Sequence, residues 1–313
     1  MEIQQALQRA PNTLSAYRRG LDDYLGFCIR NGIDYEQAGR AEVTAFIRDM
    51  AERPPAGRRP VKGLANATVR LRLTAVRLFY DHLIEEGVRS RNPVAPGTSG
   101  QVRALVRGQR RLPWIPADED WRGILEAARE EPLRNQLMLA LAYDCALRRG
   151  ELCAIATGDF DPAYRTVTIR AETTKSGRGR CLPYSPETGD LFACYLTERR
   201  SLGIGRGPLF LSTSTRNRGA PLSHWTWSKV VEGLAERSGV SKLSTHSLRH
   251  LCLTDLARTG WEAYEIAAFA GHRNIQTSLI YIHLSARDLS AKFLQGMASV
   301  HQARMALLKG QLA

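Results

Sequence analysis

Phosphate chemistry is indicated by His246 and Arg249, which lie three residues apart directly after Ser244 and Thr245. Serine and threonine are common helix caps, so a helix is expected to begin here. At this spacing the imidazole and the guanidinium lie on one face of the first helical turn. Beside the free backbone N–H groups of that turn they would form a seat for a phosphate.

Tyr281 follows this cluster, nine residues after the dipeptide Gly271-His272. Glycine and Asn274 interrupt the chain, and we expect a second, short helix to begin near Ile275. On that helix Tyr281 projects away from the apolar stripe, together with residues 277–278. A tyrosine on a polar face near an anion site predicts a nucleophile for phosphoryl transfer.

Two other interpretations of these residues stay open. A tyrosine near a helix end is often an amphipathic packing residue. His246 and His250 lie four residues apart, as paired zinc ligands do, but no third ligand is evident and no glutamate follows His246. We therefore predict no metal and no cofactor.

Three more residues suit the same chemistry. Arg148 and Glu151 are three apart after a long apolar segment, so the carboxylate can steady the guanidinium. Lys175 is the only lysine within residues 63–228, in a chain that otherwise uses arginine. An ammonium can release a proton and a guanidinium hardly can, so Lys175 is a candidate general acid. A solvated loop lysine is the alternative.

The C-terminal two thirds of the chain combine helices with one β-hairpin. The period of two at residues 166–170 predicts a strand, 180–183 its partner, and 173–179 the tip between them. Helices are expected to start within 116–121, to run over 133–143, to resume after Pro186, to start at His224 and to run over 288–312. The predicted fold is mainly α with a small antiparallel β-sheet.

The first 95 residues are expected to form a separate helical domain. Helical periodicity runs over 12–32, 43–50 and 66–87. A Pro-, Gly- and Arg-rich segment, 96–112, follows as a basic linker, and 113–313 form the second domain. Helix arginines are ordinary on a solvated face, but arginines of the third helix, the linker and the hairpin tip are also candidate DNA contacts. These candidates are Arg70, Arg72, Arg77, Arg107, Arg110, Arg111 and Arg178.

Composition favours nucleic acid as the partner. The net charge is +13, with 38 Arg against 6 Lys, and arginine matches phosphate geometry with two hydrogen bonds. The arginine bias of a GC-rich genome is the alternative. The six cysteines lack Cys-x-x-Cys spacing and are expected in the core, in a reducing cytosol. We see no signal peptide and no apolar run long enough for a membrane span, so we expect a cytoplasmic protein.

Taken together, these residues resemble the tyrosine recombinase family, also called phage integrases, and especially its Xer-like bacterial members. The resemblance covers nearly the whole chain and includes the segments 12–19 and 92–94 of the helical core-binding domain. In the catalytic domain it rests on six residues in the family's order and spacing: Arg148, Lys175, His246, Arg249, His272 and Tyr281. Arg149-Gly150 and Ile282 differ from common Xer-like residues, but neither replaces a catalytic group.

The resemblance implies a role for each residue. Tyr281 would attack a DNA phosphate and form a 3′-phosphotyrosyl link, and the cationic cluster would lower its pKa. Arg148, Arg249 and His272 would stabilise the transition state, and His246 would accept a proton and contact the phosphate. Lys175 would protonate the leaving 5′-oxygen, and Glu151 would position Arg148.

The resemblance also implies partners. The expected substrate is double-stranded DNA with paired inverted-repeat sites, recombined by a tetramer through a four-way junction, with a monomer off DNA. Accessory DNA-bending proteins are possible, and neither metal nor ATP is needed. The alternatives are a type IB topoisomerase-like enzyme and a DNA-binding protein without catalysis.

Overall fold

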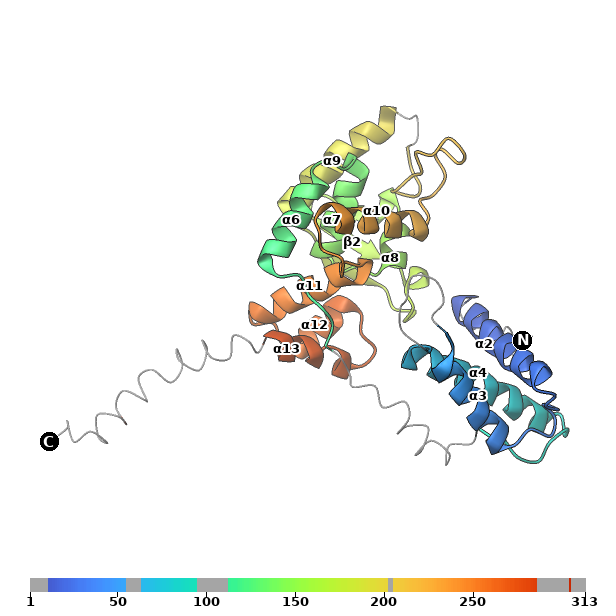
Figure 1. The fold of residues 1–313 in the computed structure, drawn as a ribbon. Coiled ribbons are helices and arrows are strands. Elements are labelled where there is room, and N and C mark those ends of the chain that lie inside the picture. The colour runs from blue at the N-terminus through green and yellow to red at the C-terminus, as the bar shows by residue number, and fades with distance from the viewer. Residues whose placement is uncertain (1–10, 55–62, 95–111, 202–204, 286–303, 305–313) are drawn as a thin grey trace. The chain divides into compact units, whose positions relative to one another are not determined.

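A computed structural model of the protein describes residues 11–54, 63–94, 112–201, 205–285 and 304. The chain forms two compact units, Met1–Arg111 and Leu112–Ala313 (Figure 1). Each unit has its own hydrophobic core. The predicted class is confirmed, because the described residues are mainly helical with one small antiparallel sheet.

The N-terminal unit consists of three described helices, which agree with the predicted ranges. They are α2 (Pro11–Arg30), α3 (Arg40–Glu52) and α4 (Asn66–Glu85). Helices α2 and α4 pack closely, because a Cβ atom at Gly20 would lie 3.2 Å from Cα of Arg72. In the core the hydroxyls of Tyr24 and Tyr80 are 2.6 Å apart, so each buried hydroxyl has a hydrogen-bond partner.

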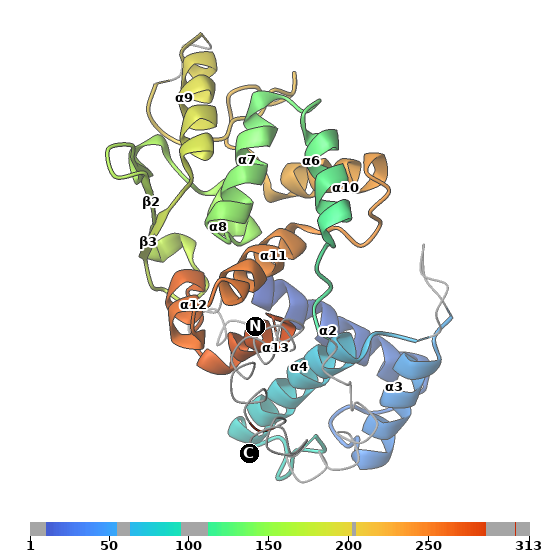
Figure 2. The same cartoon turned by 90° about the vertical axis from the view of Figure 1, so that its left-hand side faces the viewer.

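Most helices of the C-terminal unit pack around α11. Residues on more than one side of α11 are therefore buried, so its sequence has only a weak amphipathic pattern. The N-cap Ser244 accepts a 3.2 Å hydrogen bond from the Ser247 amide, as the sequence predicts. Figure 2 shows α11 between α7 and the pair α12 and α13. The α-helices are α6 (Asp118–Ala128), α7 (Leu133–Asp144), α8 (Arg149–Cys153), α9 (Pro186–Ser201), α10 (His224–Arg237), α11 (Thr245–Arg258), α12 (Ala263–Ala270) and α13 (Leu279–Ser285).

The sheet has the order β1-β2-β3, with antiparallel neighbours. Its strands are β1 (Phe160–Asp161), β2 (Thr166–Ile169) and β3 (Arg180–Pro183), and the 3-10 turns η2 (Thr157–Asp159) and η3 (Ala171–Thr173) flank β1 and β2. Val167 pairs with Leu182, and both are buried. Strand β1 was not predicted, because two residues are too short for a periodic pattern.

Two expectations about local structure are wrong. The chain at 275 forms one 3-10 turn, η4 (Ile275–Thr277), and the α-helix begins only at Leu279. The change of helix type shifts the angular positions of the following side chains, so the predicted apolar stripe does not hold. Not all cysteines enter the core either: Cys181 and Cys194 are exposed. The helix expected over 288–312 lies outside the described residues, apart from residue 304.

Candidate active site

Arg148 and Glu151 interact as their spacing predicts. Arg148 is the N-cap of α8, and its Nη1 donates to Oε1 of Glu151 over 2.7 Å. The other carboxylate oxygen accepts from the backbone N–H of Arg148 over 3.1 Å. Burial by itself raises the pKa of Glu151, but its bonds to Arg180 and Arg148 outweigh burial and leave the pKa lowered. Glu151 is therefore a carboxylate at neutral pH.

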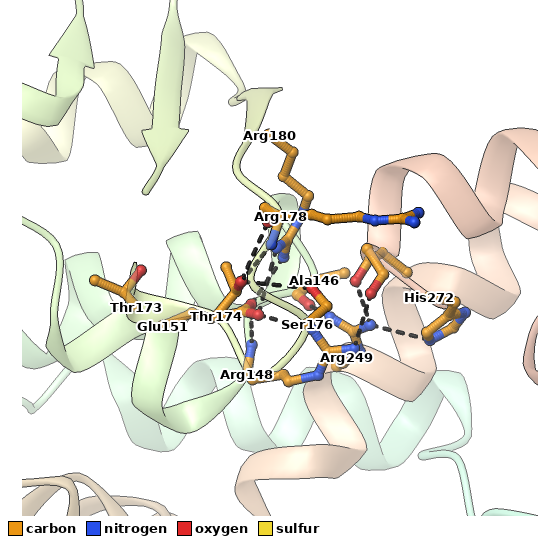
Figure 3. A network of polar contacts seen from close by, with 12 residues as sticks. Ala146, Arg148, Glu151, Thr173, Thr174, Ser176, Arg178, Arg180, Arg249 and His272 are labelled. Atoms are coloured by element: carbon orange, nitrogen blue, oxygen red, sulfur yellow. Dashed lines mark hydrogen bonds and ion pairs between the residues drawn. The ribbon is translucent and has the colours of Figure 1, made fainter. Parts of the chain in front are cut away.

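Arg180 is a second cation on the same carboxylate, and sequence reasoning missed it. Its Nη2 lies 2.8 Å from Oε2 of Glu151, and its Nε donates to the carbonyl of Phe269 over 2.9 Å (Figure 3). Arg180 precedes buried Leu182 by two residues in β3, so both face the core. An arginine on the apolar side of a strand needs a buried partner, which is the signal that could have found it.

Arg249 is the most deeply buried cation of the cluster, with 1% exposure. It donates to the carbonyls of Ala146 over 2.5 Å and Ala270 over 2.6 Å, and to Nε2 of His272 over 3.0 Å (Figure 3). Ala146 has a φ of +47°, an uncommon conformation for alanine, in the turn that presents this carbonyl. We expected Arg249 to lie beside the free backbone N–H groups of the first helical turn. Instead, carbonyl groups of two other segments hold its guanidinium.

No carboxylate forms an ion pair with Arg249 among the described residues. Burial first, and then the charge of Arg148, lower its pKa to about 10, so it keeps its charge at neutral pH. Arg148 donates to the carbonyl of Gly271, which neighbours the Ala270 carbonyl that Arg249 uses. Arg148 and Arg249 thus donate to neighbouring carbonyls. Glu151 binds Arg148 and Arg180, so the described residues place three arginines beside one carboxylate. Such a site has an excess of positive charge and can attract an anion.

His272 is held in one tautomer by its two neighbours. The guanidinium of Arg249 can only donate, so Nε2 of His272 accepts and Nδ1–H donates to Oγ of Ser278 over 2.8 Å. Burial and the charges of Arg249 and Arg148 lower the pKa of His272 to about 3, so the ring is neutral. Gly271 precedes it with a φ of +63°, which ends α12 and turns the chain into the site. Ser278 was not predicted, because its role depends on the turn η4.

Tyr281 lies in this cluster, but not on a polar, open face. It is 3% exposed and belongs to the core of the unit. Its ring is stacked on His272, with centroids 6.1 Å apart and planes 6° from parallel. Burial raises the pKa of Tyr281, and Arg249 and Arg148 offset this only in part. The expectation of a lowered pKa is therefore wrong for the chain without DNA, because desolvation of the phenolate outweighs the cations.

His246 and His250 differ in their surroundings. Their rings meet edge to face with centroids 4.7 Å apart. Nδ1 of His250 is 2.9 Å from the hydroxyl of Tyr281, whereas His246 is exposed. Partial burial of its imidazole, and then the charges of Arg249 and Arg148, lower the pKa of His246. No group of three or more His, Cys, Asp or Glu residues in the described ranges could hold a metal ion.

Lys175 lies in the β2–β3 connection, as predicted, and its side chain is exposed. Within the described part of the chain it has no hydrogen bond or ion pair, so the structure does not bring it into contact with the cluster. The hydroxyl of Thr174 organises this turn and accepts from the backbone N–H of Arg178 over 3.1 Å. A cavity of about 140 Å³ separates the turn from α12, and Ser176, Arg178, Arg180, His272 and Arg273 contribute to its lining.

The other candidate arginines fall into three groups. Arg77 and Arg178 are exposed, and so is Arg70. Arg72 instead forms an ion pair with Asp23 inside the N-terminal unit. Arg107, Arg110 and Arg111 lie outside the described residues. Arg149, which departs from common Xer-like residues, donates to Oγ of Ser228 over 2.8 Å and does not add to the cluster around Glu151.

The chain matches the sequence models of two domains. One is described as "Phage integrase family" and matches residues 117–287, and the other as "Phage integrase, N-terminal SAM-like domain" and matches residues 2–87. No helix among the described residues has both the length and the apolar character to span a membrane.

Curated relatives and solved structures agree with this match. Tyrosine recombinase XerD of Caulobacter vibrioides is 31% identical over 93% of this chain and 91% of its own. Tyrosine recombinase XerC of Herpetosiphon aurantiacus is 28% identical over 91% and 88%. The Tn1549 transposon integrase in complex with transposon right end DNA has a TM-score of 0.71 at 17% identity, covering 90% of this chain and 92% of its own. A lambda integrase dimer bound to a COC′ core site has a TM-score of 0.65 at 19% identity, covering 88% of this chain and 93% of its own.

The chain belongs to the phage integrase family. Within it, the chain is an Xer-like tyrosine recombinase, an enzyme that breaks and rejoins DNA. The family predicted from the sequence is thereby confirmed, and the topoisomerase and non-catalytic alternatives are not favoured.

Proposed function

We propose that the chain recombines DNA at specific sites through a 3′-phosphotyrosyl intermediate formed on Tyr281. The observation that carries this proposal is the buried cation Arg249, which has no carboxylate partner among the described residues and lies in one cluster with Arg148, His272 and Tyr281. A buried charge without a counter-ion is costly unless a ligand supplies that counter-ion. A DNA phosphate has the required charge and geometry.

Each residue then has one task. Arg148, Arg249 and His272 hold the non-bridging oxygens and stabilise the charge of the pentavalent transition state. His246, exposed beside them, contacts the phosphate. Lys175 donates a proton to the 5′-oxygen as the P–O5′ bond breaks, and Glu151 positions Arg148.

The link to Tyr281 conserves the phosphoester, so rejoining needs no ATP. A 5′-hydroxyl attacks the phosphotyrosine, returns its proton to Lys175 and releases the tyrosine. The arginines do the electrostatic work that a metal ion does in other phosphoryl transfers, and no cofactor takes part.

The substrate is double-stranded DNA with paired inverted-repeat sites. The similar Tn1549 transposon integrase is in complex with transposon right end DNA, which supports this partner. Four subunits exchange strands through a Holliday junction, the chain is a monomer off DNA, and DNA-bending proteins could assist. Residues 1–95 form the core-binding domain, 96–112 a basic linker and 113–313 the catalytic domain of this cytoplasmic enzyme. DNA contacts come from exposed arginines and the linker: Arg70, Arg77, Arg178, Arg107, Arg110 and Arg111.

Covalent trapping tests the proposal. Nicked suicide duplexes, drawn from the DNA that flanks the gene, are incubated with wild type and with Tyr281→Phe, and the products are separated on a denaturing gel. We expect a slow protein–DNA band with wild type alone. A band that persists in the variant would contradict the assignment of Tyr281, and tight binding without any band would favour a DNA-binding protein without catalysis.

A second assay separates the enzyme from a topoisomerase. Supercoiled plasmids with and without paired sites are compared. Recombination only of the plasmid with paired sites is expected, whereas relaxation of both plasmids would indicate a type IB topoisomerase-like activity.

A further inference from the structure

The hydroxyl of Tyr281 has a single hydrogen-bond partner among the described residues, which is His250. Nδ1 of His250 lies 2.9 Å from the phenolic oxygen, and the two rings are 5.7 Å apart with planes tilted by 37°. His250 follows Arg249 directly on α11. One helical step of about 100° therefore separates the side chain that faces the anion site from the side chain that faces the nucleophile.

The surroundings of His250 keep its ring neutral. His246 and Arg249 are its charged or titratable neighbours on α11, Tyr281 faces it from α13, and His272 stacks on the Tyr281 ring. Burial first, and then His246 and Arg249, lower the pKa of His250 to about 4. A neutral imidazole has one nitrogen that can accept a proton. In the tautomer with the proton on Nε2, Nδ1 of His250 accepts from the Tyr281 hydroxyl, which is then aligned for transfer.

We propose that His250 is a catalytic residue that accepts the proton of Tyr281 through Nδ1 as the phenolic oxygen attacks the phosphorus. The inference rests on the proposed function and adds a base to it. The Oη–H bond breaks and an Nδ1–H bond forms, while the Oη–P bond forms and the P–O5′ bond breaks. Lys175 supplies the proton for O5′. In rejoining, the imidazolium returns its proton to the leaving phenolic oxygen.

DNA binding strengthens this base. Arg249 lowers the pKa of His250 because an imidazolium would lie beside an uncompensated guanidinium. A bound phosphate neutralises that guanidinium, so the same imidazole becomes more basic when the substrate is in place.

His246 is less well placed for this role. The sequence-based assignment gave proton acceptance to His246, the histidine of the pair that lies three residues before Arg249. In the structure His246 is exposed and has no hydrogen bond among the described residues, and only its ring contact with His250 connects it to Tyr281. His246 therefore keeps the phosphate contact, and His250 takes the proton.

Single-turnover cleavage of a nicked suicide duplex tests the proposal with the full chain. The variant His250→Asn can place its Oδ1, a hydrogen-bond acceptor, near the position of Nδ1 but cannot take up a proton at neutral pH, and His250→Gln is a second replacement. We expect the rate of covalent-complex formation to fall about 100-fold at pH 7 with an unchanged Kd for the duplex. His283→Asn, an exposed histidine on the same helix as Tyr281, is the matched control and should keep the wild-type rate.

Two further readouts distinguish a base from a structural contact. The rate of His250→Asn should rise tenfold per pH unit between pH 7 and 9, as hydroxide replaces the base, while the wild-type rate reaches a plateau. With a 5′-bridging phosphorothioate, whose sulfur leaves without an acid, Lys175→Ala should recover and His250→Asn should not.

The outcomes separate this inference from the proposed function. Loss of all covalent complex in wild type would overturn both. Wild-type cleavage that depends on Tyr281, together with wild-type rates in both His250 variants, would overturn the role of His250 alone. Recovery of His250→Asn by the phosphorothioate would also overturn it, because the defect would then lie in leaving-group protonation.

Discussion

Arg180 and Glu151 form an ion pair, with 2.8 Å between Nη2 and Oε2 and side-chain exposures of 8% and 2%. The same carboxylate holds Arg148, and Arg180 also holds the last turn of α12 through the carbonyl of Phe269. Glu151 therefore connects the hairpin strand β3 to Arg148 at the start of α8. Removing one partner of a buried pair is costly, because the other charge stays buried.

We predict that Arg180→Met lowers the free energy of unfolding by about 3–5 kcal/mol, the usual cost of breaking a buried ion pair from one side. Chemical denaturation measures this loss. Arg180→Lys keeps the charge but not the two-pronged geometry, so it should lose less stability and still cleave suicide duplexes more slowly than wild type. Equal stability of wild type and Arg180→Met would show that the pair contributes little.

Ser278→Ala should slow cleavage by about tenfold. The substitution removes the acceptor for Nδ1–H of His272 and leaves that donor buried without a partner, at a cost of about 1–3 kcal/mol. His272 can then change tautomer and lose its fixed orientation towards Arg249. Ser278→Thr keeps the hydroxyl and serves as the control. Identical single-turnover rates for the alanine variant and wild type would contradict the role of Ser278.

Stability should fall as the pH drops from about 6.5 towards 5. His250 and His272 have pKa values lowered to about 4 and about 3 in the folded chain, below the ordinary value near 6.5. In this pH range the two histidines bind protons in the unfolded chain but not in the folded chain. Each histidine therefore lowers the free energy of unfolding by at most about 1.4 kcal/mol for each pH unit of acidification. Melting temperatures at pH 7 and 5 test this. The melting temperature should change less between pH 7 and 5 in His250→Asn than in wild type. The same change in both proteins would contradict a contribution from His250.

DNA affinity should fall steeply with salt, because the proposed contacts are mainly to phosphates. Arg77→Ala, which removes an exposed cation of α4, should reduce the slope of log K against log salt by about 1. Arg72→Ala should instead destabilise the N-terminal unit, since Arg72 is paired with Asp23. Affinity that is constant from low to physiological salt would contradict a broad basic surface.

Local signals in the sequence were sufficient for the fold class and for the residues of the family motif. Ser244 caps α11, as its residue type predicts, and the alternation at 166–170 identified a strand. These signals depend on a few neighbouring residues, so they are readable without the fold. Arg148 and Glu151 could likewise be paired because three residues bring side chains together on any helical turn.

Contacts between distant segments were decided only by the tertiary structure. Arg180 meets Glu151, and His250 meets Tyr281, across 29 and 31 residues of sequence. The burial of Tyr281 depends on the 3-10 turn at 275–277, which rotates α13 relative to a continuous helix. The direction of the pKa shift of Tyr281 followed from that burial, because desolvation outweighed the nearby arginines. Sequence thus determined which groups are present, and packing determined their partners and protonation.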